Sequence, residues 1–262
     1  MIKQSMFLFV LFLGTLSLPA LSSERSLDSV SICDDDDEWP PYTFYERKNG
    51  HKTDRLTGYS VELVGEIFRD EDVAFQISLQ PWKRCYENVK QGKVNMFLSG
   101  TVTDKRNQDF YISKPAYTTH GYYFYSTKFY PQGLKIKSLE DLKSYRIGGR
   151  LGCNYTPYGI DETLLRVSTF SFQSLVQCLN INRCDLFLEK IELLTGHAFV
   201  NSNVFSDQAL GYAPIPGAAP ETFHIMFTKS TKGLRLKSII DAGIGRMEED
   251  GRLKGLHDKY IR

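Results

Sequence analysis

Two spacings of apolar residues alternate along the first part of the chain. In residues 59–70 the apolar positions recur with helical spacing, which predicts a helix with one buried face. Residues 73–79 alternate between apolar and polar, which predicts a strand, and residues 81–91 are predicted to form a short helix. Short apolar runs at 29–33 and 94–100 are predicted strands. The order strand–helix–strand–helix–strand indicates a doubly wound α/β unit.

The same alternation begins again after an aromatic stretch at residues 122–125, which predicts a second α/β unit. Ligands of open α/β sheets bind beyond the carboxyl ends of the strands, and two such units facing each other form a hinged cleft. We therefore predict an α/β fold with two hinge-linked, doubly wound lobes. The elements expected in the second half are strands at 145–149, 184–189 and 223–228 and helices at 171–179, 230–249 and 253–260.

The first 22 residues have the features of a signal peptide. Lys3 precedes an apolar stretch at 6–18 that is too short to span a bilayer, and small residues at 19–22 suit cleavage after Ser22. The rest of the chain has no apolar run near the roughly 20 residues that a spanning helix needs. The sequence therefore predicts a protein exported to the periplasm.

Charge and histidine content exclude several function classes. The formal net charge of +1 includes Lys3, so the mature chain is near neutral, and we expect neither a nucleic-acid nor a membrane-surface partner. The five histidines are scattered, and neither CxxC nor HExxH occurs. We predict no metal site and no cofactor.

Five cysteines raise the question of disulfides, which export permits. Cys178 and Cys184 bracket a tight turn, which suits a local bridge, and Cys33 and Cys85 are a candidate second pair. Spacing alone cannot fix the connectivity, and one of the five, Cys153 in this pairing, is left over.

A run of acidic residues, CDDDDEWPPYTFY at 33–45, stands at the end of the first predicted strand. It could be a cation site, a solvated loop or the rim of a binding cleft. A calcium loop needs ligands at alternate positions and a downstream bidentate Glu, which this consecutive run does not supply. We expect the two prolines to stiffen the loop and most of residues 34–38 to be solvated.

Seven local patterns follow one another along the chain: WPPYTFY (39–45), GYSVELVGEIF (58–68), PWKRC (81–85), QGKVNMFLSGTVTDKR (91–106), SLEDLKSYRIGG (138–149), RCDLFLE (183–189) and MEEDGRLKGLHDKY (247–260). Taken together, over almost the whole chain from residue 29 to 261, they resemble the family 3 extracellular solute-binding proteins, the periplasmic receptors of polar-amino-acid ABC importers. The resemblance implies the type II periplasmic-binding-protein fold, with lobe 1 at 23–120 and 223–262, lobe 2 at 121–222, and hinges near 117–123 and 220–224.

The resemblance places the family's carboxylate-binding arginine at Arg106, with Ser99 and Thr101 as the hydroxyl and backbone contacts before it. A guanidinium binds a carboxylate through two parallel hydrogen bonds, which suits this role. The alternative is an ordinary exposed arginine at a helix start beside Asp104.

Aromatic and polar residues complete the site that the resemblance implies. Trp39 and Trp82 are expected to form its apolar walls, and a cation over a Trp ring gains about 0.5 to 2 kcal/mol. The alternative for Trp82 is a core position under the following helix. Further candidate contacts are Arg84, Arg150 and Asn154, and the alternative for Arg84 is an ordinary surface arginine. Independently of the resemblance, the acidity of residues 34–38 favours a ligand with a positive group, for which Asp36 is the candidate contact.

One position departs from the family pattern. The family's amine-binding aspartate aligns with Lys190, beside Glu189. Either Glu189 takes the amine or the ligand has no free amine.

We predict a monomeric, non-enzymatic receptor that captures a small carboxylate-bearing polar solute, an amino acid or a related compound, between its lobes and delivers it to the membrane permease of an ABC importer. Two alternatives use the same scaffold. A cyclohexadienyl or prephenate dehydratase would need a general acid, for which Glu189 and Glu38 are the candidates. A ligand-sensing module would differ only in its membrane partner.

Overall fold

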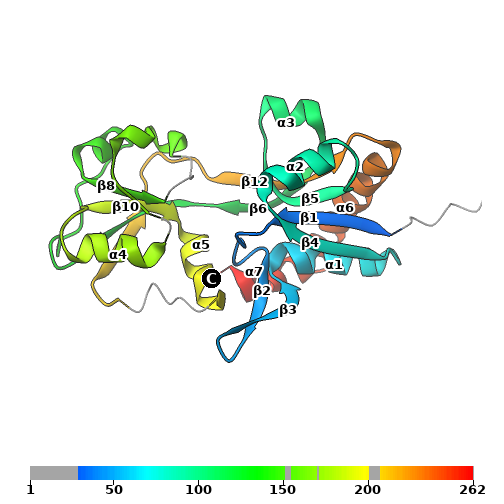
Figure 1. Cartoon of the computed structure of the whole chain (residues 1–262), viewed down its shortest axis with the longest axis horizontal. Coiled ribbons are helices and arrows are strands. Elements are labelled where there is room, and N and C mark those ends of the chain that lie inside the picture. The colour runs from blue at the N-terminus through cyan, green and yellow to red at the C-terminus, as the bar shows by residue number, and fades with distance from the viewer. Residues whose placement is uncertain (1–28, 151–154, 170, 201–206, 262) are drawn as a thin grey trace, which may run out of the picture.

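The computed structural model describes residues 29–150, 155–169, 171–200 and 207–261. These residues form two lobes, each built on a five-stranded sheet, joined by strands that cross between them (Figure 1). The predicted signal peptide, Cys153 and Asn154 lie outside the described residues. No helix in the described ranges is both long and apolar enough to cross a membrane.

The sheet of lobe 1 has a parallel half and an antiparallel half. β1 pairs in parallel with β4 and β5, whereas β12 runs antiparallel to β5 and β6. The strand order is β4 (Phe75–Gln80), β1 (Val30–Asp35), β5 (Met96–Thr101), β12 (Glu221–Thr228) and β6 (Phe110–Thr119).

Apolar side chains cover both faces of this sheet. One face packs against α1 (Tyr59–Asp70), α6 (Thr231–Glu249) and α7 (Arg252–Tyr260). The other face packs against α2 (Trp82–Lys90), and α3 (Asp104–Asp109) follows β5. Cys33 within β1 is bonded to Cys85 in α2, which confirms the candidate second disulfide. The disulfide therefore fixes α2 to β1, an interior strand of the sheet.

The sheet of lobe 2 has the order β11 (Leu210–Pro214), β7 (Gly121–Ser126), β10 (Leu186–Lys190), β8 (Ile147–Arg150) and β9 (Leu165–Thr169). Its helices α4 (Phe172–Asn180) and α5 (Ile191–Gly196) lie on either side of β10 in the chain. The predicted bridge Cys178–Cys184 joins the end of α4 to the segment before β10. Short 3₁₀ turns fill the connections, at Glu140–Ser144, Thr156–Tyr158, Glu162–Leu164 and His197–Val200.

The chain passes between the lobes twice. His120 separates β6 from β7 on the first passage, and residues 215–220 separate β11 from β12 on the second. The lobe boundaries 23–120, 121–222 and 223–262 stay a prediction, and the division of the strands between the two sheets is consistent with them.

A protruding hairpin, β2 (Phe44–Lys48) with β3 (His51–Thr57), was not predicted. It follows the WPPY loop, whose Pro40–Pro41 peptide is cis. Gly58 follows the hairpin and has φ +119°, and a Cβ atom there would lie 2.3 Å from the carbonyl oxygen of Tyr42. Only glycine fits this point, where the chain returns to the body of lobe 1 and begins α1.

Candidate functional site

A pocket of about 310 Å³ lies on lobe 1 at the cleft. Five of the predicted site residues line it, on the strand ends and loops of one sheet edge: Trp39, Trp82, Ser99, Thr101 and Arg106. Four further residues that the sequence did not single out as binding residues complete the lining: Asp34, Asp35, Glu221 and Phe223.

Arg106 is held in place by its own turn. Thr103 caps α3 by accepting a hydrogen bond from the Arg106 backbone N–H at 3.2 Å. The guanidinium Nη1 donates to the Thr101 carbonyl at 2.8 Å and to its hydroxyl at 2.7 Å, and Cζ lies 5.6 Å from the Trp82 ring centre. Burial lowers the pKa of Arg106 below its ordinary value, but an arginine remains charged. Among the described residues it forms no ion pair, and both of its side-chain hydrogen bonds use Nη1, so the guanidinium retains donors for an anion.

The two tryptophans have different surroundings. Trp82 packs edge-on against Phe97, with ring centres 5.2 Å apart, and so belongs partly to the core under α2 while it lines the pocket. Trp39 lies 6.1 Å from the ring of Phe223, which itself stacks on Tyr117 at 4.9 Å. Aromatic rings therefore form two walls around Arg106.

The acidic run is not the solvated loop that we expected. β1 extends through Asp34, which is 1% exposed, and its carboxylate accepts hydrogen bonds from Thr43 Oγ1 at 2.8 Å and Ser99 Oγ at 3.0 Å. Burial raises the pKa of Asp34 to about 6, against the effect of these hydrogen bonds. The Ser99 hydroxyl donates to Asp34 rather than into the pocket.

Glu38, at the far end of the same run, is also removed from solvent. Its carboxylate lies 3.1 Å from Arg47 and 2.8 Å from Lys52 of the hairpin, and it accepts a hydrogen bond from the Tyr45 N–H. Although burial acts to raise it, the pKa of Glu38 is lowered, because Arg47 and Lys52 stabilise the charged form. Only Asp36 and Asp37 of the run are exposed.

Two candidate contacts lie away from the pocket. Asp36 and Arg84 are exposed, and neither lines a described pocket. Asp36 follows β1 on the loop, and Arg84 lies on the outer face of α2. The chain therefore places the neighbours Asp34 and Asp35, rather than Asp36, at the cleft.

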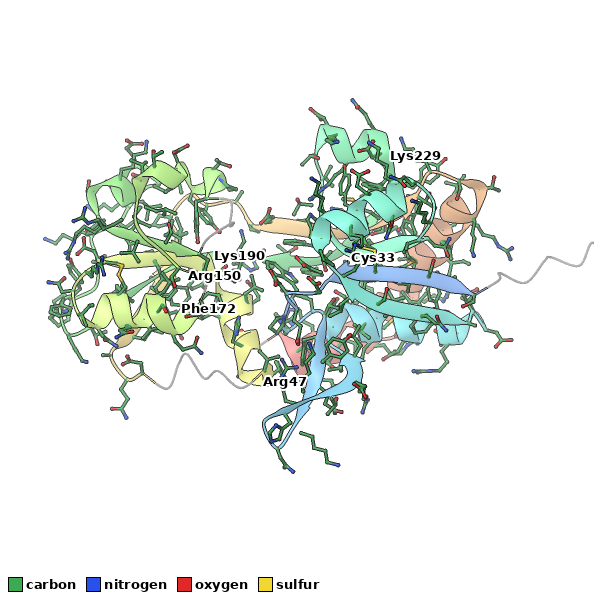
Figure 2. All side chains as sticks on the ribbon, in the orientation of Figure 1. Cys33, Arg47, Arg150, Phe172, Lys190 and Lys229 are labelled. Carbon is green, nitrogen blue, oxygen red and sulfur yellow. A yellow bond between two sulfur atoms is a disulfide. The ribbon has the colours of Figure 1, made fainter. Side chains whose placement is uncertain are left out.

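A second pocket, of about 400 Å³, lies between the lobes, and Arg150 is the charged side chain that lobe 2 contributes to its described lining. Arg150 lines it opposite Trp39, with Cζ 4.7 Å from the Phe172 ring and Nη1 3.7 Å from Glu189. Glu189 is buried, which raises its pKa. Figure 2 shows Arg150, Phe172 and Lys190 on the side of lobe 2 that faces lobe 1.

Lys190 ends β10 at the base of the cleft. Its ammonium lies 2.8 Å from the Glu221 carboxylate and donates to the Tyr158 hydroxyl at 3.0 Å. Burial alone would lower the pKa of Lys190, but Tyr158 and Glu221 raise it, so the side chain stays a cation. No group of three or more metal-ligating side chains occurs within the described ranges.

Residues 32–262 match the family model of bacterial extracellular solute-binding proteins, family 3. The chain belongs to this family. The match covers both lobes, so the predicted family and the predicted two-lobed fold are confirmed. The predicted general function, a solute-binding receptor of an ABC importer, is confirmed with them. Neither the family match nor the relatives support the dehydratase alternative.

A curated relative of this family member is the L-cystine-binding protein TcyJ of Escherichia coli K12. It is 24% identical over 237 residues, which are 85% of this chain and 79% of the relative. The family match and the alignment with this relative together cover nearly all of the described chain.

Solved structures share the fold at low sequence identity. The amino-acid ABC transporter substrate-binding protein AbpA of Streptococcus pneumoniae, bound to L-arginine, is 19% identical with a TM-score of 0.65, covering 88% of this chain and 93% of that one. An ancestral cationic amino acid solute-binding protein is 19% identical with a TM-score of 0.67, covering 89% and 96%. A histidine kinase sensor domain is 17% identical with a TM-score of 0.65, covering 88% and 96%.

Proposed function

We propose that this receptor binds an amino acid between its lobes in the periplasm, as a monomer and without chemical change, and delivers it to the permease of an ABC importer. The relatives support an amino-acid ligand: one is named for L-cystine, and one solved structure contains L-arginine. The family supports export and the ABC permease as partner.

The position of Arg106 is the observation that carries the proposal. Its guanidinium is oriented by Thr101, stands beside Trp82 and opens into the lobe 1 pocket. It can therefore bind an α-carboxylate with two hydrogen bonds, while the Trp39 and Trp82 rings contact the ligand's side chain. Arg150 is proposed to approach the ligand from lobe 2 when the lobes close, and Asn154, outside the described residues, stays a predicted contact.

The environment of Glu38 argues against dehydratase chemistry. A general acid must hold a proton near neutral pH, whereas the ion pairs with Arg47 and Lys52 lower the pKa of Glu38. Glu189 has a raised pKa but does not line the pocket that contains Arg106. We expect no phenylpyruvate when the protein is incubated with prephenate; turnover would overturn the non-enzymatic part of the proposal.

The binding test is a thermal-shift screen of amino acids, beginning with L-cystine and L-arginine, followed by calorimetry, since a ligand of the native state raises the melting temperature. We expect Arg106→Ala to weaken the amino acid that binds by about 30-fold or more, because truncating one partner of a hydrogen-bonded charge pair costs at least about 2 kcal/mol. The matched control is Arg69→Ala, an exposed arginine at the end of α1. Unchanged binding by Arg106→Ala, or no amino acid binding to the wild type, would refute the proposal.

A further inference from the structure

Three charged side chains of alternating sign stand at the base of the cleft. Arg106 of lobe 1 and Glu221 of β12 line the same pocket, and Lys190 of lobe 2 lies 2.8 Å from Glu221. The carboxylate of Glu221 is thus between a guanidinium and an ammonium that come from different lobes. Figure 2 places Lys190 at the lobe 2 edge of the gap between the lobes.

Both members of the Glu221–Lys190 pair adjoin the crossing point of the chain. Glu221 pairs with Thr119 at the end of β6, Lys190 pairs with Gly121 at the start of β7, and only His120 separates these partners. Atoms beside a hinge move least when two lobes rotate. The ion pair therefore persists as the lobes close, and Glu221 keeps its place in the pocket.

Lys190 is fixed by its surroundings. Its ammonium lies 5.1 Å from the centre of the Tyr158 ring and is hydrogen-bonded to the Tyr158 hydroxyl. Tyr158 itself packs against the hinge backbone, where a Cβ atom on Gly121 would lie 2.6 Å from the ring. A cation held in this way occupies one oxygen of Glu221, Oε2, and cannot move far from it.

The ammonium of an α-amino acid needs an acceptor beside Arg106, because a single carbon separates it from the carboxylate. Three acids line the pocket. Asp34 is buried and both of its oxygens already accept hydrogen bonds. Asp35 accepts the Asp37 backbone N–H through Oδ1, and burial raises the pKa of its carboxyl, which disfavours the charged form that an ammonium needs. Glu221 is 35% exposed, and among the described residues its Oε1 has no hydrogen bond or ion pair.

We propose that Glu221 accepts the α-ammonium of the ligand and that Lys190, which shares this carboxylate, weakens the binding of amino acids. The inference rests on the proposed function. Lobe 1 and the hinge strand thereby hold both charged groups of the amino acid, and lobe 2 supplies a repelling cation instead of an acceptor. The two residues consequently have opposite effects on affinity.

The test uses an amino acid and the same molecule without its amine: L-arginine with 5-guanidinopentanoate, and L-cystine with 3,3′-dithiodipropionate. By calorimetry, Glu221→Gln is expected to weaken the amino acid about tenfold or more and to change the desamino analogue little, because only the amino acid loses a charged acceptor. Lys190→Met keeps the stem packed on Tyr158 and is expected to strengthen the amino acid about fivefold, because it removes a like charge.

Glu140→Gln and Lys143→Met are the matched controls, since these residues form an exposed 2.7 Å ion pair in lobe 2 outside both pockets. Neither is expected to change binding. The inference is overturned if Glu221→Gln weakens the two ligands of a pair equally or not at all, or if Lys190→Met weakens the amino acid. If the variants give either of these results but the wild-type protein binds the amino acid, the proposed function still stands. If the wild-type protein binds no amino acid, the proposed function itself is refuted.

Discussion

The two lobes present faces to the cleft that are built in different ways. On lobe 1 the site is supported from beneath: a disulfide joins β1 to α2, and Thr101 orients Arg106. On lobe 2 the charged side chains are already paired, Arg150 with Glu189 and Lys190 with Glu221, and the disulfide lies beyond α4. The comparison indicates that lobe 1 is the better supported half of the proposed site.

The largest expected effect concerns the lobe 1 disulfide. Cys33 and Cys85 are fully buried and 52 residues apart, so the bridge removes much chain entropy from the unfolded state, worth about 4 kcal/mol. Replacing both with Ser should lower the free energy of unfolding by about that amount in urea titrations. A loss of unfolding free energy no larger than the loss caused by removing the Cys178–Cys184 disulfide would contradict the view that lobe 1 is better supported than lobe 2.

The buried carboxylate beneath the lobe 1 pocket should show itself in the pH dependence of stability. The pKa of Asp34 is raised from 3.8 to about 6, so its charged form destabilises the folded state above pH 6, and this penalty disappears as the pH falls towards 4. Asp34→Asn should therefore be more stable than wild type at pH 7, by up to about 3 kcal/mol, and this advantage should vanish near pH 4.

Urea titrations across this pH range measure the Asp34 effect, with the exposed Asp54→Asn as control. If the difference in unfolding free energy between Asp34→Asn and wild type is constant from pH 4 to 7, the pKa of Asp34 is not raised and lobe 1 does not contain a destabilising buried charge at this position.

The lobe 2 disulfide should matter less than its lobe 1 counterpart. Cys178 and Cys184 are six residues apart, and a loop of this size corresponds to about 2 kcal/mol. Replacing both with Ser should lower the free energy of unfolding by about that amount and leave ligand affinity unchanged, because the bridge lies away from both pockets. A loss of affinity would show that α4 transmits strain to the cleft.

Arg150 should give the smallest effect. Because its guanidinium already contacts Phe172 and Glu189, Arg150→Ala should weaken the bound amino acid by less than about tenfold, against the larger loss at Arg106. Calorimetry measures the dissociation constants of Arg150→Ala and Arg106→Ala for the same amino acid, so that the two losses of affinity can be compared. Equal losses would mean that the two lobes hold the ligand equally.

Strong periodicity accounts for the elements that could be predicted. Helix α1 spans the predicted residues 59–70, and α6 ends at Glu249 as predicted but begins at Thr231, one residue later than predicted, with Ser230 as its cap. Strand β6 was missed because it contains Pro115, which usually argues against a strand. The edge position of β6 and the irregular register there tolerate it. The hairpin β2–β3 was missed because its strands carry mostly polar residues.

The site was predictable only where neighbours in sequence act together. Thr101, Thr103 and Arg106 lie in one turn, and the structure brings the first and last into the pocket. Five consecutive acidic residues carry no pattern that separates a buried residue from exposed ones. The sequence therefore indicated Asp36 as the ligand contact, whereas the strand register buries Asp34 beside the pocket. Glu221 was missed because its partner Lys190 meets it only through the fold.

A third contact between the lobes bears on ligand affinity. Gly196 at the end of α5 packs against Pro41, and Phe199 lies 5.5 Å from Phe44 and 5.8 Å from Tyr260, so lobe 2 touches lobe 1 beside the crossing strands (Figure 1). Lobes that share this contact have less freedom of rotation than lobes joined by the two crossing strands alone. Less of the binding free energy is then needed to order the two halves, so this aromatic contact favours affinity without touching the ligand.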